Sequence, residues 1–425
     1  MTNAPIRILV VLPMYGGSLP IGRYCVSALR SLGHTVDVFE APDFHPAFTA
    51  LKGLHVTADR LEHLESSFLQ VVSQSILAKV ETFGPDLVLC LAQAPMSRQA
   101  LKRLRRDGVA TAMWFVEDFR LFTYWRAFAP YYDFFAVIQK DPFLQELAGI
   151  GIENALYLPM AALPEFHRPV VLSPVEQRKY GADVAFLGAG YPNRRVAFRQ
   201  LVHLDFKIWG SEWEGEPLLE RHLQLGGARV SAEDSVTIYN ATRINLNLHS
   251  SVQSRSLVTG GDFVNPRTFE LAAIGAFQLV DRRELMDELF AWDELATFES
   301  MEELLERIHH FLGHPEERLA YAQRAQQRVL AEHTYQHRMQ ALLAFVQERR
   351  PGWPAPREQG AGLPDDLPEP LRQELGALLH KLALPADAAF TDVIAALRQR
   401  SGELDGLETS LLFLDAWRKQ YSGDQ

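Results

Sequence analysis

Two carboxylates eight positions apart are the most informative chemical signal in this chain of 425 residues. They are Asp262 and Glu270, in the segment from Gly260 to Gly275, GGDFVNPRTFELAAIG. Pro266 is a favoured first residue of a helix, so we expect Asp262 in the preceding loop and Glu270 on the following turns. Both carboxylates could then face one cleft and accept hydrogen bonds from ligand hydroxyl groups. Alternatively, Glu270 caps or pairs on a helix surface, and spacing alone leaves both interpretations open.

The start of this predicted helix suits an anionic ligand. A helix N-terminus has N–H groups without partners inside the helix, here around Arg267 and Thr268, with Asn265 just before them. We therefore predict that these residues lie close to a bound anion.

A second loop also suits an anion. The segment GAGYPNRR follows a predicted strand, so its backbone at Gly188 and Gly190 could wrap a phosphate that Arg194 or Arg195 neutralises. It lacks the three spaced glycines of the dinucleotide fingerprint, and an ordinary strand-to-helix turn remains the alternative.

A third acidic group, Asp118, follows the predicted strand 111–116, at the sheet edge where α/β proteins bind ligands. A carboxylate there can act as a general base and take the proton from an attacking hydroxyl. Glu117 alternates with Asp118, and either is alternatively a solvated loop charge. The aromatic residues that follow could stack on a ligand, although buried packing is the reading we favour: Phe119, Phe122, Tyr124, Trp125 and Phe128.

Other signals are weaker. Gly16 and Gly17 form a ligand loop or a plain turn after the first predicted strand, and His45 and His249 are candidate bases or structural histidines. We find no group of Cys or His residues with the spacing of metal ligands. Glu117 and Asp118 are adjacent rather than in an Asp-x-Asp arrangement, so we expect no metal site.

The elements that must position these residues alternate between strand and helix. In the first half, buried apolar runs predict strands at 6–12, 35–39, 87–92, 111–116 and 134–138, and amphipathic stretches predict helices at 21–32, 61–83 and 97–106. Short Gly-bearing turns between them predict a parallel, doubly wound sheet.

A second set of the same kind follows a Pro-rich crossing segment at 159–174. Its strands are expected at 183–187, 206–209, 244–248 and 278–280, and helices at 316–332 and 336–349. We place the two domains at 1–163 and 164–349, with helix 336–349 returning to the first domain.

The tail is expected to be separate. Residues 350–370 hold six prolines and predict a flexible linker. Residues 371–425 regain helical periodicity, and the stripe Leu407, Leu411, Leu414 and Trp417 could pack on the chain's own body, on a second copy or on a protein partner.

Composition excludes several classes. A net charge of −11 argues against a nucleic-acid binder, and the basic stretch Lys102 to Arg106 is better explained as a solvated helix face. The two cysteines lie in apolar segments, no apolar run reaches the length of a membrane span, and the N-terminal run is too short for a signal peptide. We therefore expect a soluble, cytoplasmic protein.

The acidic pair resembles that of GT-B glycosyltransferases, with Asp262 in place of the usual first Glu. Residues about 183–340 resemble the CgeB-like (spore maturation protein) branch, close to glycosyltransferase family 1. The similarity lies in Asn265, Arg267, Phe269, Glu270, Ala273, Gly275 with Phe277 to Asp281, in Phe186-Leu187-Gly188, Arg194-Arg195, Ile208-Trp209-Gly210, Ile244 to Leu248, His333-Thr334-Tyr335 and His337-Arg338. The first half matches more diffusely, through Gly33-His34, Trp114-Phe115 and Asp118, and the tail matches nothing.

This resemblance implies an α/β fold of two Rossmann-like domains facing across a cleft, with a helical appendage. It implies a metal-independent hexosyltransferase without a cofactor, whose co-substrate is a nucleotide-diphosphate sugar, a UDP-sugar before others. Glu270 would hold the ribose, Asn265 and Arg267 would approach the diphosphate or sugar, and Asp118 and Asp262 would be the catalytic candidates.

The acceptor would be a hydroxyl of a glycan, protein or metabolite. A nucleotide-sugar epimerase and a non-catalytic nucleotide-sugar-binding scaffold remain alternatives, as does association through the C-terminal helices with a second copy or a protein partner.

Overall fold

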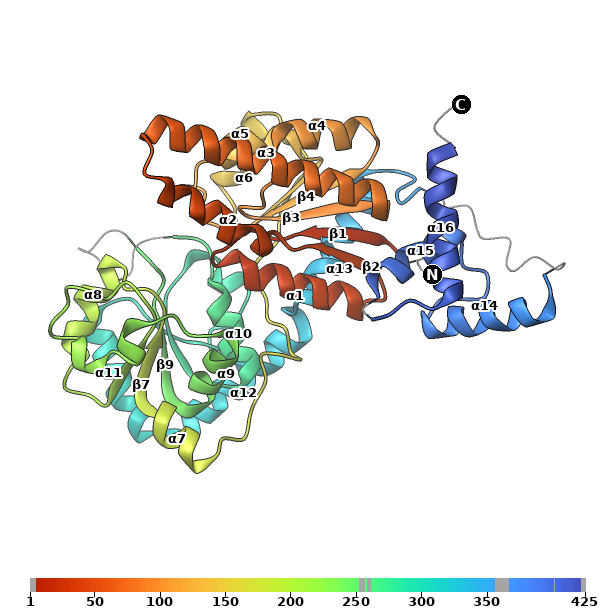
Figure 1. Cartoon of the computed structure of the whole chain (residues 1–425). Coiled ribbons are helices and arrows are strands. Elements are labelled where there is room, and N and C mark those ends of the chain that lie inside the picture. The colour runs from red at the N-terminus through yellow and green to blue at the C-terminus, as the bar shows by residue number, and fades with distance from the viewer. Residues whose placement is uncertain (1–4, 252–256, 258–260, 356–366, 401, 422–425) are drawn as a thin grey trace.

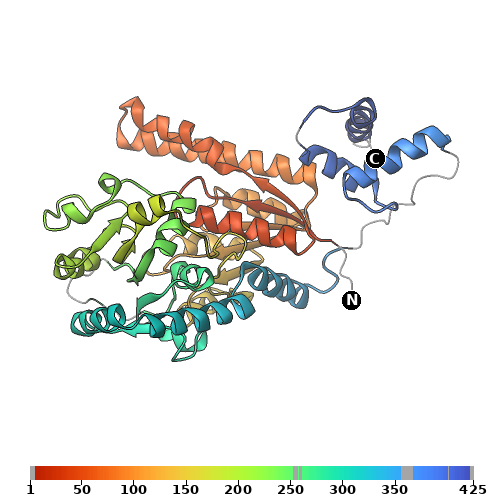
Figure 2. The same ribbon diagram turned by 90° about the horizontal axis from the view of Figure 1, so that it is seen from below.

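Two α/β domains and a helical appendage make up the chain (Figure 1). The structure, a computed structural model, describes residues 5–251, 257, 261–355, 367–400 and 402–421. Gly260, the first residue of the segment with the carboxylate pair, lies outside them. The appendage lies beside the first domain and away from the second (Figure 2). Within the described ranges, no helix has the length and apolar character needed to cross a membrane.

The first sheet is entirely parallel, in the order β2-β1-β3-β4-β5-β6. Helices cover both faces, which is why every residue of β1, β3, β4 and β5 is buried. Helices α1 (Ser18–Ser31) and α13 (Tyr335–Arg349) pack on one face, and α3 (Ala58–Phe83), α4 (Arg98–Arg106) and α6 (Phe143–Gly149) pack on the other. The strands are β1 (Arg7–Val11), β2 (Thr35–Phe39), β3 (Leu87–Leu91), β4 (Ala110–Phe115), β5 (Phe134–Val137) and β6 (Ala155–Tyr157).

The second sheet is also parallel, in the order β11-β10-β9-β7-β8. Helices α8 (Pro192–Phe198) and α11 (Met301–Gly313) pack on one face, and α9 (Ala232–Ala241) and α10 (Pro266–Ile274) on the other. Both predicted sheets are confirmed, except that the short β6 and β11 were not predicted. The strands are β7 (Ala182–Leu187), β8 (Phe206–Trp209), β9 (Thr242–Asn247), β10 (Gln278–Asp281) and β11 (Ala296–Phe298).

The last helices of the second domain return the chain to the first. After α12 (Pro315–Glu332), Thr334 bridges to Ala162 in the crossing segment, and Arg338 donates hydrogen bonds to the carbonyl oxygens of Pro159 and Met160, at 2.7 and 3.0 Å. Helix α13 then packs against α1, as predicted for 336–349. The motif from His333 to Arg338 therefore joins the domains.

The tail differs in part from the expected free linker. Trp353 donates a hydrogen bond from its indole nitrogen to the carbonyl of Asp86 at 3.0 Å, so residues 350–355 dock on the first domain. Residues 356–366 of the predicted linker lie outside the described residues. Helices α14 (Glu369–Lys381), α15 (Phe390–Gln399) and α16 (Gly406–Tyr421) form the appendage around a small core of their own. Asp392 of α15 forms an ion pair with Arg7 of β1 at 2.9 Å.

Each sheet has one point where successive strands are added on opposite sides, between β1 and β3 in the first domain and between β7 and β9 in the second. Ligands of open α/β sheets bind outside the carboxyl ends of the strands at such points. Gln139, just after β5, donates a hydrogen bond to Asp262, just before α10, at 2.9 Å. The carboxyl edges of the two sheets therefore face each other.

Candidate functional site

The loops after β7 and β9 bring most of the predicted site residues to the carboxyl edge of the second sheet. The first loop holds Gly188 to Arg195, and the second leads to Asn265, the N-cap of α10. The two segments that the sequence analysis singled out separately as anion-binding candidates therefore lie at the same edge of the sheet.

Asn265 orders the start of α10. Its Oδ1 accepts the N–H of Thr268 at 3.1 Å, and its own N–H donates to Nε2 of His249 at 2.9 Å. Pro266 has no N–H to offer. The N–H of Thr268, which we expected to be free, is therefore already bonded. The positive charge at the start of this helix comes from the helix dipole and from Arg267.

A buried network that the sequence did not reveal supports Asn265. Nδ1 of His249 donates to Asp281 at 2.7 Å, and Asn247 Oδ1 accepts from the Asn265 side chain at 2.8 Å. Burial alone would raise the pKa of Asp281, but His249 and Arg283 outweigh it and hold that pKa below its ordinary value. His249, weighed above as a candidate base, is thus fully occupied in positioning the helix. Burial also lowers its pKa.

Two arginines lie over one aromatic ring at this edge. The guanidinium carbons of Arg194 and Arg267 are 4.9 and 5.3 Å from the centroid of Phe186. Burial, helped by the charge of Arg267, lowers the pKa of Arg194 to about 9. Such paired cations would be stabilised by an anionic ligand.

The two arginines are held differently. Arg194 donates to the carbonyl oxygens of Leu248 and Ala189, at 2.7 and 2.9 Å, so most of its donors are occupied by backbone. Arg267 donates from Nε to the Tyr239 hydroxyl at 3.2 Å. Its Nη2 lies beside Gly188, where the Cβ of any other residue would be only 3.1 Å away. Arg267 is therefore the better placed of the two to bind an anion.

Arg195 shapes the loop. It donates to the carbonyl oxygens of Gly190, Glu212 and Glu214. A Cβ at Gly190 would lie 2.1 Å from the Glu212 oxygen, so no side chain fits there. The structure gives both residues a role in fixing the loop rather than in direct contact with phosphate.

Glu270 lies one turn beyond Arg267 in α10, with 19% of its side chain exposed. Burial raises its pKa to about 7, against the opposing charge of Arg267. His167 lies nearby, 3.8 Å away, but its Nδ1 accepts the N–H of Leu163 and burial lowers its pKa to about 3, so the ring is neutral. Glu270 is therefore a carboxylate available to accept hydrogen bonds rather than half of an ion pair.

Asp262 has different partners from Glu270. It is 6% exposed, and one carboxylate oxygen accepts from Gln139 of the first domain. The other oxygen, Oδ2, is buried and has no hydrogen-bond partner among the described residues. Asp262 thus links the domains and keeps one oxygen unpaired.

In the first domain, Glu117 rather than Asp118 is the carboxylate held in place by other elements. Asp118 accepts the N–H of Arg120 at 2.8 Å and so stabilises its own turn. Glu117 accepts hydrogen bonds from the Tyr124 hydroxyl, at 2.7 Å, and from the Gln93 amide, while burial raises its pKa. Glu117 is therefore a partly buried loop carboxylate with two side-chain partners.

The aromatic cluster divides into two groups. Phe119 and Trp125 are buried and contact the Phe143 ring at 4.5 and 4.8 Å, which confirms internal packing for them. The other three line a pocket of about 550 Å³ in the first domain: Phe122, Tyr124 and Phe128.

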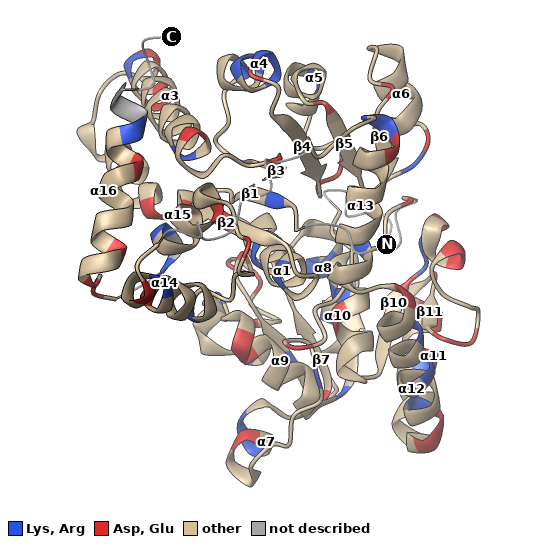
Figure 3. Cartoon of the chain, turned by 90° about the vertical axis from the view of Figure 1, so that its right-hand side faces the viewer, with Lys and Arg blue, Asp and Glu red and all other residues tan. Residues whose placement is uncertain are grey.

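The basic residues of α4 have ordinary surface roles. Lys102, Arg103, Arg105 and Arg106 are exposed on α4, which confirms the solvated basic face (Figure 3). Arg103 and Arg105 pair with carboxylates of neighbouring elements.

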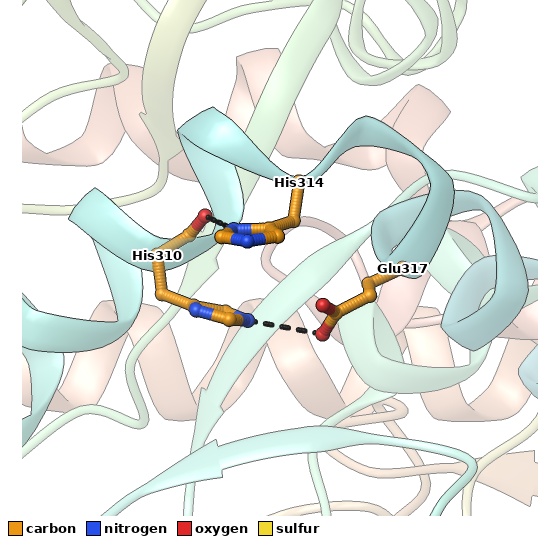
Figure 4. Close-up of side chains that lie close together, drawn as sticks. All are labelled: His310, His314 and Glu317. Atoms are coloured by element: carbon orange, nitrogen blue, oxygen red, sulfur yellow. Dashed lines mark hydrogen bonds and ion pairs between the residues drawn. The ribbon is translucent and has the colours of Figure 1, made fainter.

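One histidine cluster does have metal-ligand spacing, contrary to the sequence analysis. His310, His314 and Glu317 place one ligand atom each within 4.8 Å of one another at the junction of α11 and α12 (Figure 4). Their atoms already form local contacts, His310 to Glu317 at 3.0 Å and His314 to the His310 carbonyl at 2.6 Å. All three are exposed, and none belongs to the carboxyl edges described above.

Comparisons with known proteins give a family match and similar folds. Residues 170–344 match a family model described as glycosyl transferase-like. The spore protein CgeB of Bacillus subtilis is 26% identical over 280 residues, which cover 60% of this chain and 81% of CgeB.

Solved structures share the whole two-domain fold. HepE from Anabaena, solved with UDP and glucose, has a TM-score of 0.55 at 12% identity, over 81% of this chain and 100% of that one. A putative UDP-N-acetylglucosamine 2-epimerase from Listeria monocytogenes has a TM-score of 0.51 at 12% identity, over 81% and 97%. At these identities the similarity is one of fold.

Proposed function

We propose that this chain, which has a glycosyl transferase-like domain on a GT-B fold and is distantly related to CgeB, transfers a hexose from a nucleotide-diphosphate sugar to an acceptor hydroxyl. The observation that supports this most strongly is the pair of arginines over Phe186, with Glu270 one turn further on, at the topological switch point of the second sheet.

Each donor group has a matching partner at this edge. Arg267 and the start of α10 neutralise the diphosphate, and Glu270 accepts hydrogen bonds from the ribose hydroxyls. Asn265 positions the helix start, while Gly188, Gly190, Arg194 and Arg195 keep the preceding loop in shape. We favour UDP as the nucleotide because HepE, with the same fold, was solved with it.

In the proposed reaction the acceptor oxygen attacks the anomeric carbon, the bond from that carbon to the diphosphate breaks, and the acceptor proton passes to a carboxylate. Negative charge on the leaving diphosphate is offset by Arg267 and the helix dipole, so we expect no requirement for a metal ion. Asp118 remains a candidate base, but the fixed position of Glu117 makes it the stronger one. Asp262, with its unpaired oxygen, is a candidate for contact with the sugar.

The test is an assay of nucleotide release from a panel of nucleotide sugars, with and without acceptor extracts and with excess EDTA. We expect acceptor-dependent release of UDP that EDTA leaves unchanged. Activity lost with EDTA and restored by magnesium or manganese would contradict the metal-independent part.

A nucleotide-sugar epimerase is the second candidate because the Listeria epimerase shares the fold. The same assay separates the two. An epimerase changes the sugar without any acceptor, whereas a scaffold binds the donor and releases nothing.

A further inference from the structure

The pocket in the first domain lies at the carboxyl edge of its sheet. It opens among the loops that follow β1, β3 and β4 and is closed on one side by the first half of α3 and by Phe48 of α2 (His45–Ala50). Its volume of about 550 Å³ is in the range of small-molecule sites. The loops belong to the β1/β3 switch point and its neighbour, where this fold places ligands.

The walls of this pocket are apolar over most of their area. They are formed largely by Met14, Phe48, Leu69, Met96, Phe122 and Phe128. Among the lining residues in the described ranges, Arg98 alone is charged, and it is an exposed residue of α4. A ligand covered with hydroxyl or charged groups would lose hydration against the apolar part of the wall, whereas an aromatic or alkyl group gains by leaving water there.

Polar groups gather at one part of the wall. The Tyr124 hydroxyl accepts the backbone N–H of Gln93 at 3.0 Å and donates to Glu117 at 2.7 Å. Gln93 has a φ of 66°, a left-handed conformation that is costly for a residue with a side chain and is kept only where other contacts enforce it. Gln93 and Tyr124 line the pocket, and Glu117, which is not itself a lining residue, is hydrogen-bonded to both of them.

We propose that this pocket is the acceptor site and that it selects a hydroxyl carried by an apolar aromatic or alkyl group, with Glu117 as the catalytic base. The apolar group fills the space between α3 and the loops, and its hydroxyl reaches Glu117. The acceptor oxygen bonds to the anomeric carbon, the bond from that carbon to the diphosphate breaks, Glu117 takes the proton, and the nucleotide diphosphate leaves. This inference rests on the transferase function proposed above.

Two glucosides test the choice of acceptor, because phenyl β-D-glucoside and methyl β-D-glucoside present the same ring hydroxyls with and without an aromatic group. Calorimetry in the presence of UDP should give at least about tenfold tighter binding of the phenyl compound, the effect expected for burying a ring. Equal affinities would overturn the proposal.

A matched pair of variants tests the location. Ser66 and Ser67 are adjacent, exposed residues of α3, and only Ser66 lines the pocket. Ser66→Phe should weaken binding of phenyl β-D-glucoside about tenfold, whereas Ser67→Phe should leave it unchanged. If the two variants behave alike, the glucoside does not bind in this pocket.

Glu117→Gln tests the base. With the donor identified by the release assay, its kcat towards phenyl β-D-glucoside should fall about a hundredfold or more, and the rise of rate with pH expected for the unsubstituted protein should be absent. Unchanged kcat and pH profile would remove Glu117 from the reaction. UDP binding, measured alongside, separates the failures: no UDP binding contradicts the transferase function itself, whereas normal UDP binding with no preference for the phenyl compound contradicts only the acceptor proposal.

Discussion

The carboxyl edges of the two sheets face each other but are built in opposite ways. At the second edge, Asp281, His249, Asn247 and Asn265 form one connected hydrogen-bond network that fixes the start of α10. At the first edge, a polar cluster around Glu117 adjoins a pocket with mainly apolar walls.

This difference indicates how each side recognises its ligand. Fixed polar groups suit a ligand whose charges and hydroxyls are always the same, such as a nucleotide diphosphate. Apolar walls select by size and shape and tolerate changes of residue type. The family match over residues 170–344 covers the polar edge.

The largest effect should follow from breaking the buried network. Asp281→Ala leaves His249 and Arg283 without their carboxylate, which should lower the free energy of unfolding by about 3 kcal/mol or more, the scale for a broken buried pair. Urea unfolding measures this. At the first edge, Tyr124→Phe removes one hydroxyl and should cost about 1 kcal/mol. Equal losses would mean that the two edges are not built differently.

The second largest effect is expected on the affinity for the donor nucleotide. Arg267→Ala should weaken UDP binding by about 1.5 to 3 kcal/mol, the cost of losing hydrogen bonds to a charged group, as measured by calorimetry. Arg178→Ala, which removes an exposed arginine from the same domain, is the control and should leave the affinity unchanged. Unaltered UDP binding by a folded Arg267 variant would exclude this arginine from the donor site.

The ionised Glu270 carboxylate should lower the stability of the fold above pH 7 while it strengthens UDP binding. Its pKa in the folded state, about 7, exceeds the ordinary value of 4.5, so folding takes up a proton between these pH values and stability falls as pH rises through them. At pH 8, Glu270→Gln should therefore raise the free energy of unfolding by about 1 to 3 kcal/mol, the upper figure being reduced because 19% of the side chain is exposed.

The same variant should bind UDP more weakly, and UDP binding by the unsubstituted protein should strengthen as pH rises past about 7 and the carboxylate ionises. A Glu270→Gln protein that is both less stable and an equally good binder would contradict this account of the residue.

The smallest effect is expected from removing the appendage. A chain ending at Ala355 keeps the Trp353 contact and all donor residues, and should bind UDP within about twofold of the full chain, although it loses the Arg7–Asp392 ion pair. Light scattering and UDP titration would show it. Aggregation or lost UDP binding would instead place residues 367–421 in the catalytic core.

The sequence predicted the elements well and their contacts poorly. Apolar periodicity located both sheets and the returning helix α13, and the sequence correctly placed Arg267 and Glu270 on α10 with Asn265 just before it. That periodicity says which residues are buried, not which side chains meet.

The missed contacts join residues far apart in the chain. Two examples are the hydrogen bonds from Gln139 to Asp262 and from Tyr124 to Glu117. Both depend on how the loops turn after their strands, which no local sequence pattern specifies. The apolar pocket was missed because α3 supplies one wall from a helix that reads as an ordinary amphipathic element. The three-residue strands β6 and β11 are too short to show a period.

The central claim, that the polar edge of the second sheet binds the nucleotide, is tested most directly by a crystal structure of the chain with UDP. The account predicts the diphosphate against the Arg267 guanidinium and the first turn of α10, with the ribose hydroxyls within hydrogen-bond distance of Glu270. UDP bound in the pocket of the first domain, or bound without contact to Arg267 and Glu270, would contradict it.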